Sequence, residues 1–161
     1  MAETAVFLVA VFAVFYFTAN NMKILIPNDG SESARRAMEY GLKMAKSHNS
    51  YEITILTVAC SDFALARGVV FNPDELMSSC QAHFNMSLEK AKAMFENEGI
   101  NVNTLLVNGD PAGVIIDLVN NQGYDKVVMG TRGLSGISGM LLGSVSSKVL
   151  HNVKVPVTLI H

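Results

Sequence analysis

The chain has 161 residues, of which half are hydrophobic, and its formal net charge is −2. This length is enough for one domain with a proper core, and the near-neutral charge argues against a general nucleic-acid-binding protein. The two cysteines and four scattered histidines show no metal-ligand spacing, so the composition indicates neither a disulfide framework nor a zinc site.

An apolar extension over residues 1–21 precedes a domain predicted at 22–161. Ala5 to Phe17 is an unbroken apolar run, and no Lys or Arg precedes it, unlike the start of a signal peptide. A helix over 5–19 would reach about 22 Å, short of the roughly 30 Å hydrocarbon core of a bilayer. Three interpretations stay open: synthesis starting at Met22, a membrane tether, or a segment packed on the domain or on a partner subunit. We expect a cytoplasmic protein, with tethering to the membrane by residues 1–21 as the alternative.

From Met22 onward, strand and helix patterns alternate along the chain. Asn72-Pro73-Asp74-Glu75, after a longer connection at 61–71, supplies a helix cap, a proline at the first position and acids in the first turn. Short apolar runs are the predicted strands, and they cover 23–27, 52–58, 102–107, 126–129 and 155–160. Segments with helical spacing or capping residues are the predicted helices, which run from the turn at 28–31 to Ala45, from Asn72 to Gly99, from Asp110 to Val119 and from Ser144 to Asn152.

This alternation predicts an α/β fold, an open parallel sheet with right-handed crossovers and helices on both faces. In such sheets a ligand binds outside the carboxyl ends of the strands, where the strand order reverses. Three informative segments come at those ends: 27–29 after the first strand, Val58 after the second, and 129–133 after the fourth. If the first and fourth strands are neighbours, one crevice gathers all three segments.

The most specific pattern is Gly130-Thr131-Arg132-Gly133, then nine residues, then Gly143-Ser144-Val145-Ser146-Ser147. Glycines let backbone N–H groups approach a phosphate and tolerate a positive φ, and a helix N-terminus adds free donors and partial positive charge. The hydroxyls of Thr131 and of the three serines add further donors. Residues 126–161 contain four Lys or Arg and no Asp or Glu, which favours an anion nearby. The alternative is a flexible surface loop with an incidental charge bias.

Two further segments accompany this spacing: Ile24-Leu25-Ile26-Pro27-Asn28-Asp29-Gly30-Ser31 and Val155-Pro156-Val157. With all three, the chain from Met22 to His161 resembles the universal stress protein family, and specifically its ATP-binding subgroup. The resemblance implies an open five-stranded parallel sheet of order 3-2-1-4-5, similar to the adenine nucleotide alpha hydrolase-like fold. It also implies a homodimer formed through the last strand.

The resemblance further implies an ATP site. ATP could enter it together with a bound Mg or Mn ion. Pro27, Asp29 and Val58 would line the adenosine end, with Asp29 near the ribose or a phosphate-bound metal. Met129 and Gly130 would lie by the ribose and the α-phosphate. The residues expected to wrap the phosphates are Arg132, Gly133, Gly143, Ser144, Val145 and Ser146. Where family members often carry basic residues, this chain has Ile137-Ser138-Gly139-Met140, which leaves the phosphates to N–H groups and Arg132.

These features favour a stress-response regulator that binds or senses adenine nucleotide over an efficient enzyme. The chain has no Gly-Lys-Ser/Thr of a Walker loop, and no His or Glu in the glycine loop offers an evident general base. Two alternatives stay open. The first is a slow Mg-dependent ATP hydrolase or self-phosphorylating enzyme using Asp29 with the metal. The second is an interaction dimer of the same fold that binds no nucleotide.

Overall fold

The structure is a computed structural model that describes residues 21–48, 50–59, 73–134 and 141–161, with 73–81 described by their backbone. The predicted extension at 1–21, apart from Asn21, lies outside these residues, as do the connection 61–71 and the segment 137–140. Within the described part, no helix has the length and apolar character needed to cross a membrane.

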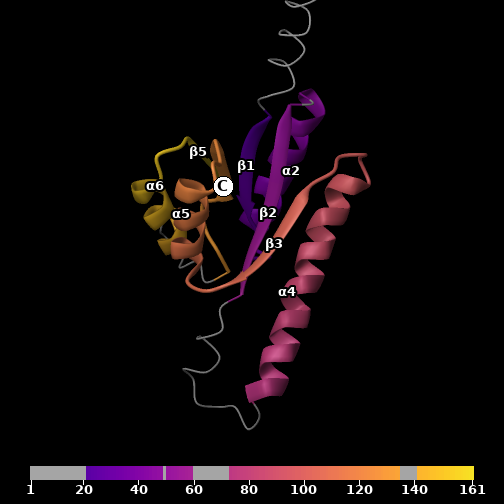
Figure 1. Ribbon diagram of the computed structural model, residues 1–161, viewed down its shortest axis with the longest axis vertical. Coiled ribbons are helices and arrows are strands. Elements are labelled where there is room, and N and C mark those ends of the chain that lie inside the picture. Colours follow the sequence, from indigo (N-terminus) through magenta and orange to yellow (C-terminus); the bar gives the residue numbers. More distant parts are fainter. Residues whose placement is uncertain (1–20, 49, 60–72, 135–140) are drawn as a thin grey trace, which may run out of the picture.

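The described residues form a five-stranded parallel sheet with helices between the strands (Figure 1). The strands are β1 (Met22–Pro27), β2 (Tyr51–Ala59), β3 (Asn103–Asn108), β4 (Lys126–Gly130) and β5 (Val157–Ile160). The helices are α2 (Glu32–Ser47), α4 (Pro73–Glu96), α5 (Pro111–Asn121) and α6 (Ser144–Asn152). The strand order β3-β2-β1-β4-β5 confirms the predicted 3-2-1-4-5 topology.

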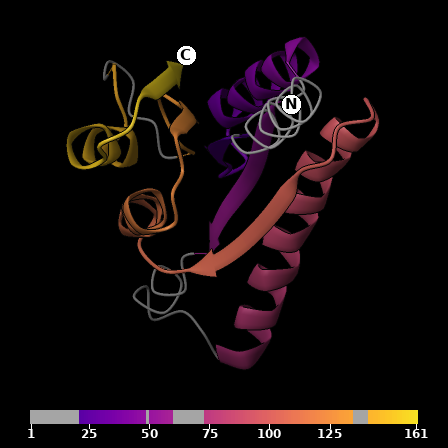
Figure 2. The same ribbon diagram turned by 45° about the horizontal axis from the view of Figure 1, so that its top comes forward.

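Each face of the sheet is covered by two helices, as expected for alternating strands and helices (Figure 2). Neighbouring residues of β1 point to opposite faces, so Ile24 and Ile26 pack with α2 and α4, whereas Leu25 packs with α5 and α6. Phe95 of α4 is fully buried in the first core, and Val149 of α6 is fully buried in the second. Two apolar cores on opposite faces therefore fix the sheet between its helices.

Local capping explains where two of the helices begin. The Ser31 hydroxyl accepts a hydrogen bond from the amide of Ala34 at the start of α2, and the Asp110 carboxylate accepts one from the amide of Gly113 at the start of α5. Each cap satisfies one of the backbone donors that a helix start leaves without an intrahelical acceptor.

The predicted strands agree with the observed ones to within one residue, except at the start of β5. This strand was expected from Val155, but it begins at Val157. Pro156 accepts a hydrogen bond from the amide of Val127, at 3.0 Å, and has no N–H to donate in return. Regular pairing with β4 therefore starts one residue after the proline.

Candidate functional site

The carboxyl ends of β1 and β4 lie side by side, and the chain leaves them toward opposite faces of the sheet. The residues after β1 enter α2, which packs on the face shared with α4. Those after β4 lead to α6, which packs on the face shared with α5. This is the switch point of the fold, where α/β sheets open a crevice for ligands. The structure thus brings together the turn after β1 and the glycine loop after β4.

Asp29 connects the turn after β1 to the glycine loop. Its exposed carboxylate accepts hydrogen bonds from the backbone amides of Ser31, at 2.9 Å, and Leu134, at 3.2 Å. A Cβ added at Gly133 would lie 2.7 Å from the Oδ2 atom of Asp29, so a side chain there would displace the carboxylate. Gly133 therefore leaves room for Asp29 beside the loop.

Gly130 ends β4 against the first turn of α2. A Cβ added at Gly130 would lie 2.8 Å from both the carbonyl carbon and the Cβ of Ser33. The Ser33 hydroxyl donates a hydrogen bond to the carbonyl oxygen of Arg132, and Ser31 donates a second one at 3.4 Å. This close approach, which sequence reasoning missed because Ser33 is distant along the chain, holds the start of the loop on α2.

Helix α6 begins without a side-chain cap. Gly143 occupies the N-cap position with φ −74° and ψ 163°, and it makes no side-chain cap hydrogen bond. Its own amide donates to the carbonyl of Thr131 at 2.7 Å, which ties the helix start to the loop. The amides of Ser144, Val145 and Ser146 fill the first turn, where a helix supplies no acceptor. Unlike α2 and α5, α6 therefore begins with no cap hydrogen bond from its N-cap side chain, an arrangement that suits an anion.

Two loop glycines, Gly130 and Gly133, serve close approach, and none of the described loop glycines has a left-handed backbone. We expected tolerance of a positive φ to be one reason for them, and this is wrong for the described loop. Among the described residues, glycines with positive φ are Gly30, Gly99, Gly109 and Gly123. At Gly143 the nearest atoms to an added Cβ lie 3.4 Å away, on Thr131 and Arg132. That is ordinary contact, so the fold leaves room for a Cβ at Gly143.

The side chains of the two loop ends differ in what they can offer. Ser146 is buried, and its hydroxyl donates to the carbonyl of Gly130 at 2.9 Å, which leaves its backbone amide at the helix start. Ser144 is exposed and Val145 half-buried. The Arg132 Nε atom is buried, with no hydrogen-bond partner among the described residues. A buried guanidinium donor without a partner forms strong hydrogen bonds with anions, which makes Arg132 a candidate phosphate partner.

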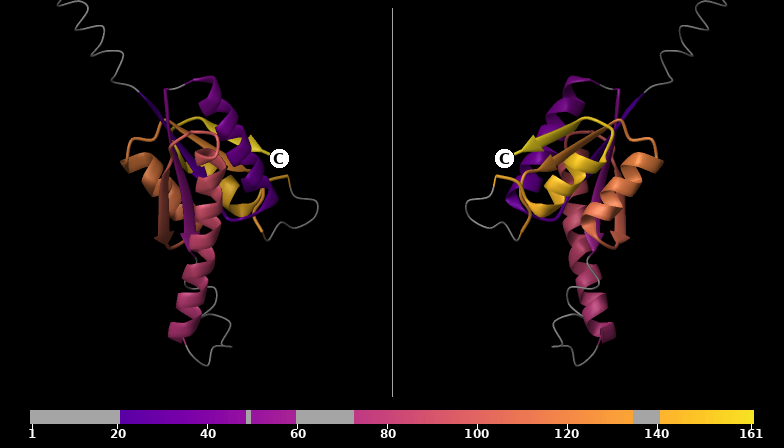
Figure 3. Two further views of the ribbon diagram at one scale, coloured as in Figure 1. Left: turned by 90° about the vertical axis from the view of Figure 1, so that its right-hand side faces the viewer. Right: turned by 90° about the vertical axis from the view of Figure 1, so that its left-hand side faces the viewer.

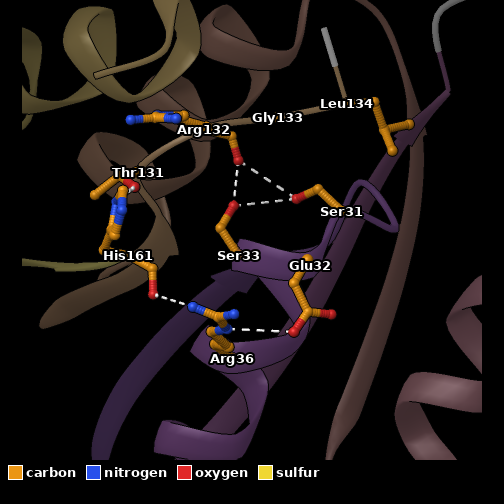
Figure 4. A pocket seen from close by; sticks show the side chains of 9 residues that line it. All are labelled: Ser31, Glu32, Ser33, Arg36, Thr131, Arg132, Gly133, Leu134 and His161. Carbon is orange, nitrogen blue, oxygen red and sulfur yellow. Dashed lines mark hydrogen bonds and ion pairs between the residues drawn. The ribbon is translucent and has the colours of Figure 1, made fainter. Parts of the chain in front are cut away.

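A pocket of about 300 Å³ lies between segment 131–134 and the start of α2 (Figure 4). Figure 4 shows the Arg132 carbonyl directed at Ser31 and Ser33, while its guanidinium extends away from them. Thr131 and His161 meet at 3.2 Å between hydroxyl and Nδ1. The lining residues are Ser31, Glu32, Ser33, Arg36, Thr131, Arg132, Gly133, Leu134 and His161. This lining includes no residue of α6, so the uncapped helix start does not line the pocket.

The charged residues at the start of α2 form an exposed ion-pair network. A hydrogen bond from Arg35, at 2.6 Å, is the main cause that lowers the pKa of the Glu32 carboxyl to about 2, and Arg36 adds to it. The same pair raises the pKa of Arg35 above its usual value. Arg36 also donates to the carbonyl of His161 at 3.1 Å, which ties α2 to the residue after β5.

The remaining predicted site residues lie at or near the carboxyl ends of strands. Pro27 is half-buried at the end of β1, Val58 is half-buried near the end of β2, and Met129 is buried in the core under α5 and α6. Within the described residues, no three His, Cys, Asp or Glu side chains lie close enough to hold a metal ion. A metal at Asp29 therefore remains a prediction that depends on a nucleotide bringing it.

A doubly wound parallel sheet with a glycine loop at its switch point defines an α/β domain of the kind that binds ligands at the carboxyl ends of its strands. The model of the universal stress protein family matches residues 20–161, and the chain belongs to this family. Among curated relatives, universal stress protein YxiE of Bacillus subtilis is 32% identical over 145 residues, covering 86% of this chain and 97% of that protein.

Solved structures share the fold. The structure of MJ0577, a universal stress protein of Methanocaldococcus jannaschii, is 26% identical and superposes with a TM-score of 0.74, covering 87% of this chain and 95% of that one. A universal stress protein family member from Arabidopsis thaliana, solved with AMP bound, is 23% identical with a TM-score of 0.60, covering 86% of this chain and 90% of that one. These comparisons confirm the resemblance and the fold inferred from the sequence.

Proposed function

We propose that this chain binds adenine nucleotide, with ATP as the preferred ligand, and acts as a nucleotide-sensing stress protein. One observation carries the proposal: α6 starts at a glycine with no side-chain cap, beside the loop that follows β4. Amides in the first turn of a helix and the positive end of its dipole are well suited to a phosphate. The AMP bound to a relative of the same fold supports an adenine nucleotide as the source of that phosphate.

The proposed site assigns a task to each end of the crevice. The amides of Ser144, Val145 and Ser146, together with the Arg132 guanidinium, take the phosphates. Gly133 and Gly143 keep this space free of side chains. The adenosine lies toward the strand ends, at Pro27, Val58, Met129 and Gly130, and Asp29 accepts from a ribose hydroxyl or binds a Mg or Mn ion held by the phosphates.

The same geometry favours binding over rapid turnover. The carboxylate nearest the loop, Asp29, accepts hydrogen bonds from two backbone amides. Segment 130–147 contains no Asp, Glu or His that could act as a general base on an attacking group at the loop. Release of inorganic phosphate from Mg-ATP by the purified protein measures turnover directly. A rate within the ordinary enzyme range, on the order of 1 per second or faster, would favour the hydrolase alternative.

Gly143→Val tests the phosphate site. The backbone angles of Gly143 suit a valine, and a Cβ there keeps 3.4 Å from its nearest atoms, so the domain should fold, which circular dichroism and thermal unfolding check before the titration. The valine Cβ would face the backbone of Thr131, Arg132 and Gly133, so its methyl groups crowd the loop beside the α6 amides, and ATP binding in a calorimetric titration should fall at least a hundredfold. Gly113→Val at the start of α5, where the nearest contact is also 3.4 Å, is the matched control and should bind like the wild type. Unchanged ATP affinity in Gly143→Val would refute the site.

We also propose that the chain forms a homodimer across β5. This strand lies at the edge of the sheet, pairs with β4 on one side, and carries half-buried residues throughout. An unpaired strand edge with apolar side chains promotes pairing with a second chain. Light scattering at tens of micromolar should give the mass of a dimer. A monomer, both with and without ATP, would overturn this assembly.

A further inference from the structure

A buried side-chain amide lies directly beside the proposed nucleotide site. Asn28 follows β1, between Pro27 and Asp29, and only 4% of it is exposed. Its Oδ1 atom accepts a hydrogen bond from the amide of Gly30 at 3.1 Å. Because that neighbour is a donor, the amide orientation is fixed, with Nδ2 directed into the protein. Asn28 therefore closes the turn that carries Asp29.

The Nδ2 group of Asn28 joins two other elements. It donates to the Thr57 hydroxyl of β2, at 3.4 Å, and to the Ser87 hydroxyl of α4, at 3.3 Å. Thr57 is 1% exposed, so this contact is sealed from water. Both donors and the acceptor of the amide are thus used within the protein, and a buried amide that loses such partners is costly. The turn, β2 and α4 are held together by one side chain.

Ser87 lies where α4 leaves the sheet. From Leu88 onward the helix packs in the core, with Ala91 and Phe95 buried. The half before Ser87 extends past the carboxyl ends of the strands, on the side of the molecule where the switch point lies (Figures 1 and 3). A Cβ added at Gly30 would lie 3.8 Å from the Ser87 hydroxyl, so the turn comes close to the helix beside the bond from Asn28.

We propose that Asn28 is a positioning residue for the nucleotide-binding turn, and that its hydrogen bond to Ser87 links nucleotide binding to the ordering of the projecting half of α4. The turn directs Asp29 toward the glycine loop, and a nucleotide that binds Asp29 stabilises the turn. The Asn28 amide then transmits that stabilisation to α4. The link rests on the proposed function, and because coupling is reciprocal, loosening α4 lowers nucleotide affinity.

Two variants separate the turn from the link. Asn28→Ser keeps a short side-chain acceptor for the amide of Gly30 but is too short to reach Thr57 and Ser87. It should lower ATP affinity about tenfold, which corresponds to ~1.4 kcal/mol. Ser87→Ala removes only the α4 partner and should lower affinity about threefold. Ile115→Val, a conservative change in the distant core under α5, controls for stability and should leave affinity unchanged.

Amide hydrogen exchange, measured with and without Mg-ATP, tests whether nucleotide binding orders α4. In the wild type, ATP should slow exchange at least threefold both in segment 130–134 and in residues 73–86 of α4. In Ser87→Ala the slowing at 130–134 should remain and that in α4 should be lost. Ser47→Ala, an exposed serine whose hydroxyl donates to its own helix, should behave like the wild type. Wild-type slowing of α4 exchange in Ser87→Ala, or unchanged ATP affinity in Asn28→Ser, would overturn the proposal.

Failure of the proposed function gives a different pattern. A wild-type protein that binds no adenine nucleotide would refute the nucleotide site and, with it, the link to binding. The positioning role is then decided in the nucleotide-free protein. In the nucleotide-free protein, the Gly30 and Leu134 amides should exchange at least three times faster in Asn28→Ser than in Ile115→Val. Equal exchange in the two variants would overturn that role.

Discussion

Replacing Gly130 by alanine should destabilise the domain, because no space exists for a methyl group where β4 ends on α2. An added Cβ would lie 2.8 Å from the carbonyl carbon and from the Cβ of Ser33, and it would also meet the Ser33 hydroxyl. The hydroxyl can rotate away. The backbone carbon cannot move unless the first turn of α2 moves with it.

The expected loss combines two effects of moving that turn. Overpacking at a rigid contact costs roughly 1–3 kcal/mol. The first turn of α2 also carries the Ser31 cap and the Ser33 hydrogen bond to Arg132. Weakening either interaction would cost up to ~1 kcal/mol of stability. We expect a loss of about 2–3 kcal/mol in the free energy of unfolding. For a chain of this size the melting temperature should fall by roughly 4–12 °C.

Urea unfolding and calorimetry measure both quantities. Gly143→Ala is the matched control, because its nearest contacts are 3.4 Å away and its backbone angles suit alanine. It should cost less than ~1 kcal/mol, the usual effect of a weaker N-cap. Wild-type stability in Gly130→Ala would show that contact with Ser33 does not explain this glycine. Equal destabilisation in both variants would show that the loop, and not the α2 contact, is sensitive.

Three further predictions follow from the site, the charges and the domain boundary. Arg132→Ala should weaken ATP at least tenfold more than adenosine in parallel titrations, because it removes a phosphate partner; equal losses would place the guanidinium away from the phosphates. The Glu32 carboxyl has a pKa lowered from 4.5 to about 2, so its stabilising contribution is present above pH 4.5 and is lost as the pH falls through 2. Unfolding of Glu32→Gln should therefore depend less on pH across this window, and an identical pH profile would contradict it. A chain that begins at Met22 should stay folded, dimeric and able to bind ATP, since β1 begins there; insolubility or lost binding would contradict this.

The fold could be predicted because local signals agree with the global topology. The apolar runs are short and separated by helical patterns, which excludes most arrangements except a parallel sheet. Two helices start at the caps that the sequence predicted, Ser31 and Asp110. The predicted stop after α4, Gly99, has a positive φ of 73°. The start of β5 was placed too early, because the apolar character of Val155 does not reveal that Pro156 interrupts the pairing.

The site could be predicted only in part, because its geometry depends on contacts between distant residues. The glycine spacing pointed to the loop, but not to Ser33 as the neighbour that requires Gly130. The Ser146 hydroxyl was expected to face phosphate, and nothing in its sequence context indicates that it donates to the Gly130 carbonyl. The bond from Asn28 to Ser87 joins residues 59 positions apart. Such pairs follow from the fold and not from any local pattern.

The glycine loop therefore answers two separate requirements, one of the fold and one of the ligand. Gly130 lets β4 end against α2, and that contact holds the loop in place before any ligand arrives. Gly143 is not required by packing against a Cβ, and as the N-cap residue it makes no side-chain hydrogen bond to the first amides of α6. Gly133 lies between them and gives Asp29 room to hold the loop at Leu134.

If the proposed function is right, the site is ordered in advance by the contact at Gly130 and by Asp29. Ordering the loop then costs little of the binding free energy, because the loop is already held in place. Substitution at Gly130 should consequently weaken the nucleotide through the fold, and substitution at Gly143 should weaken it with the fold intact.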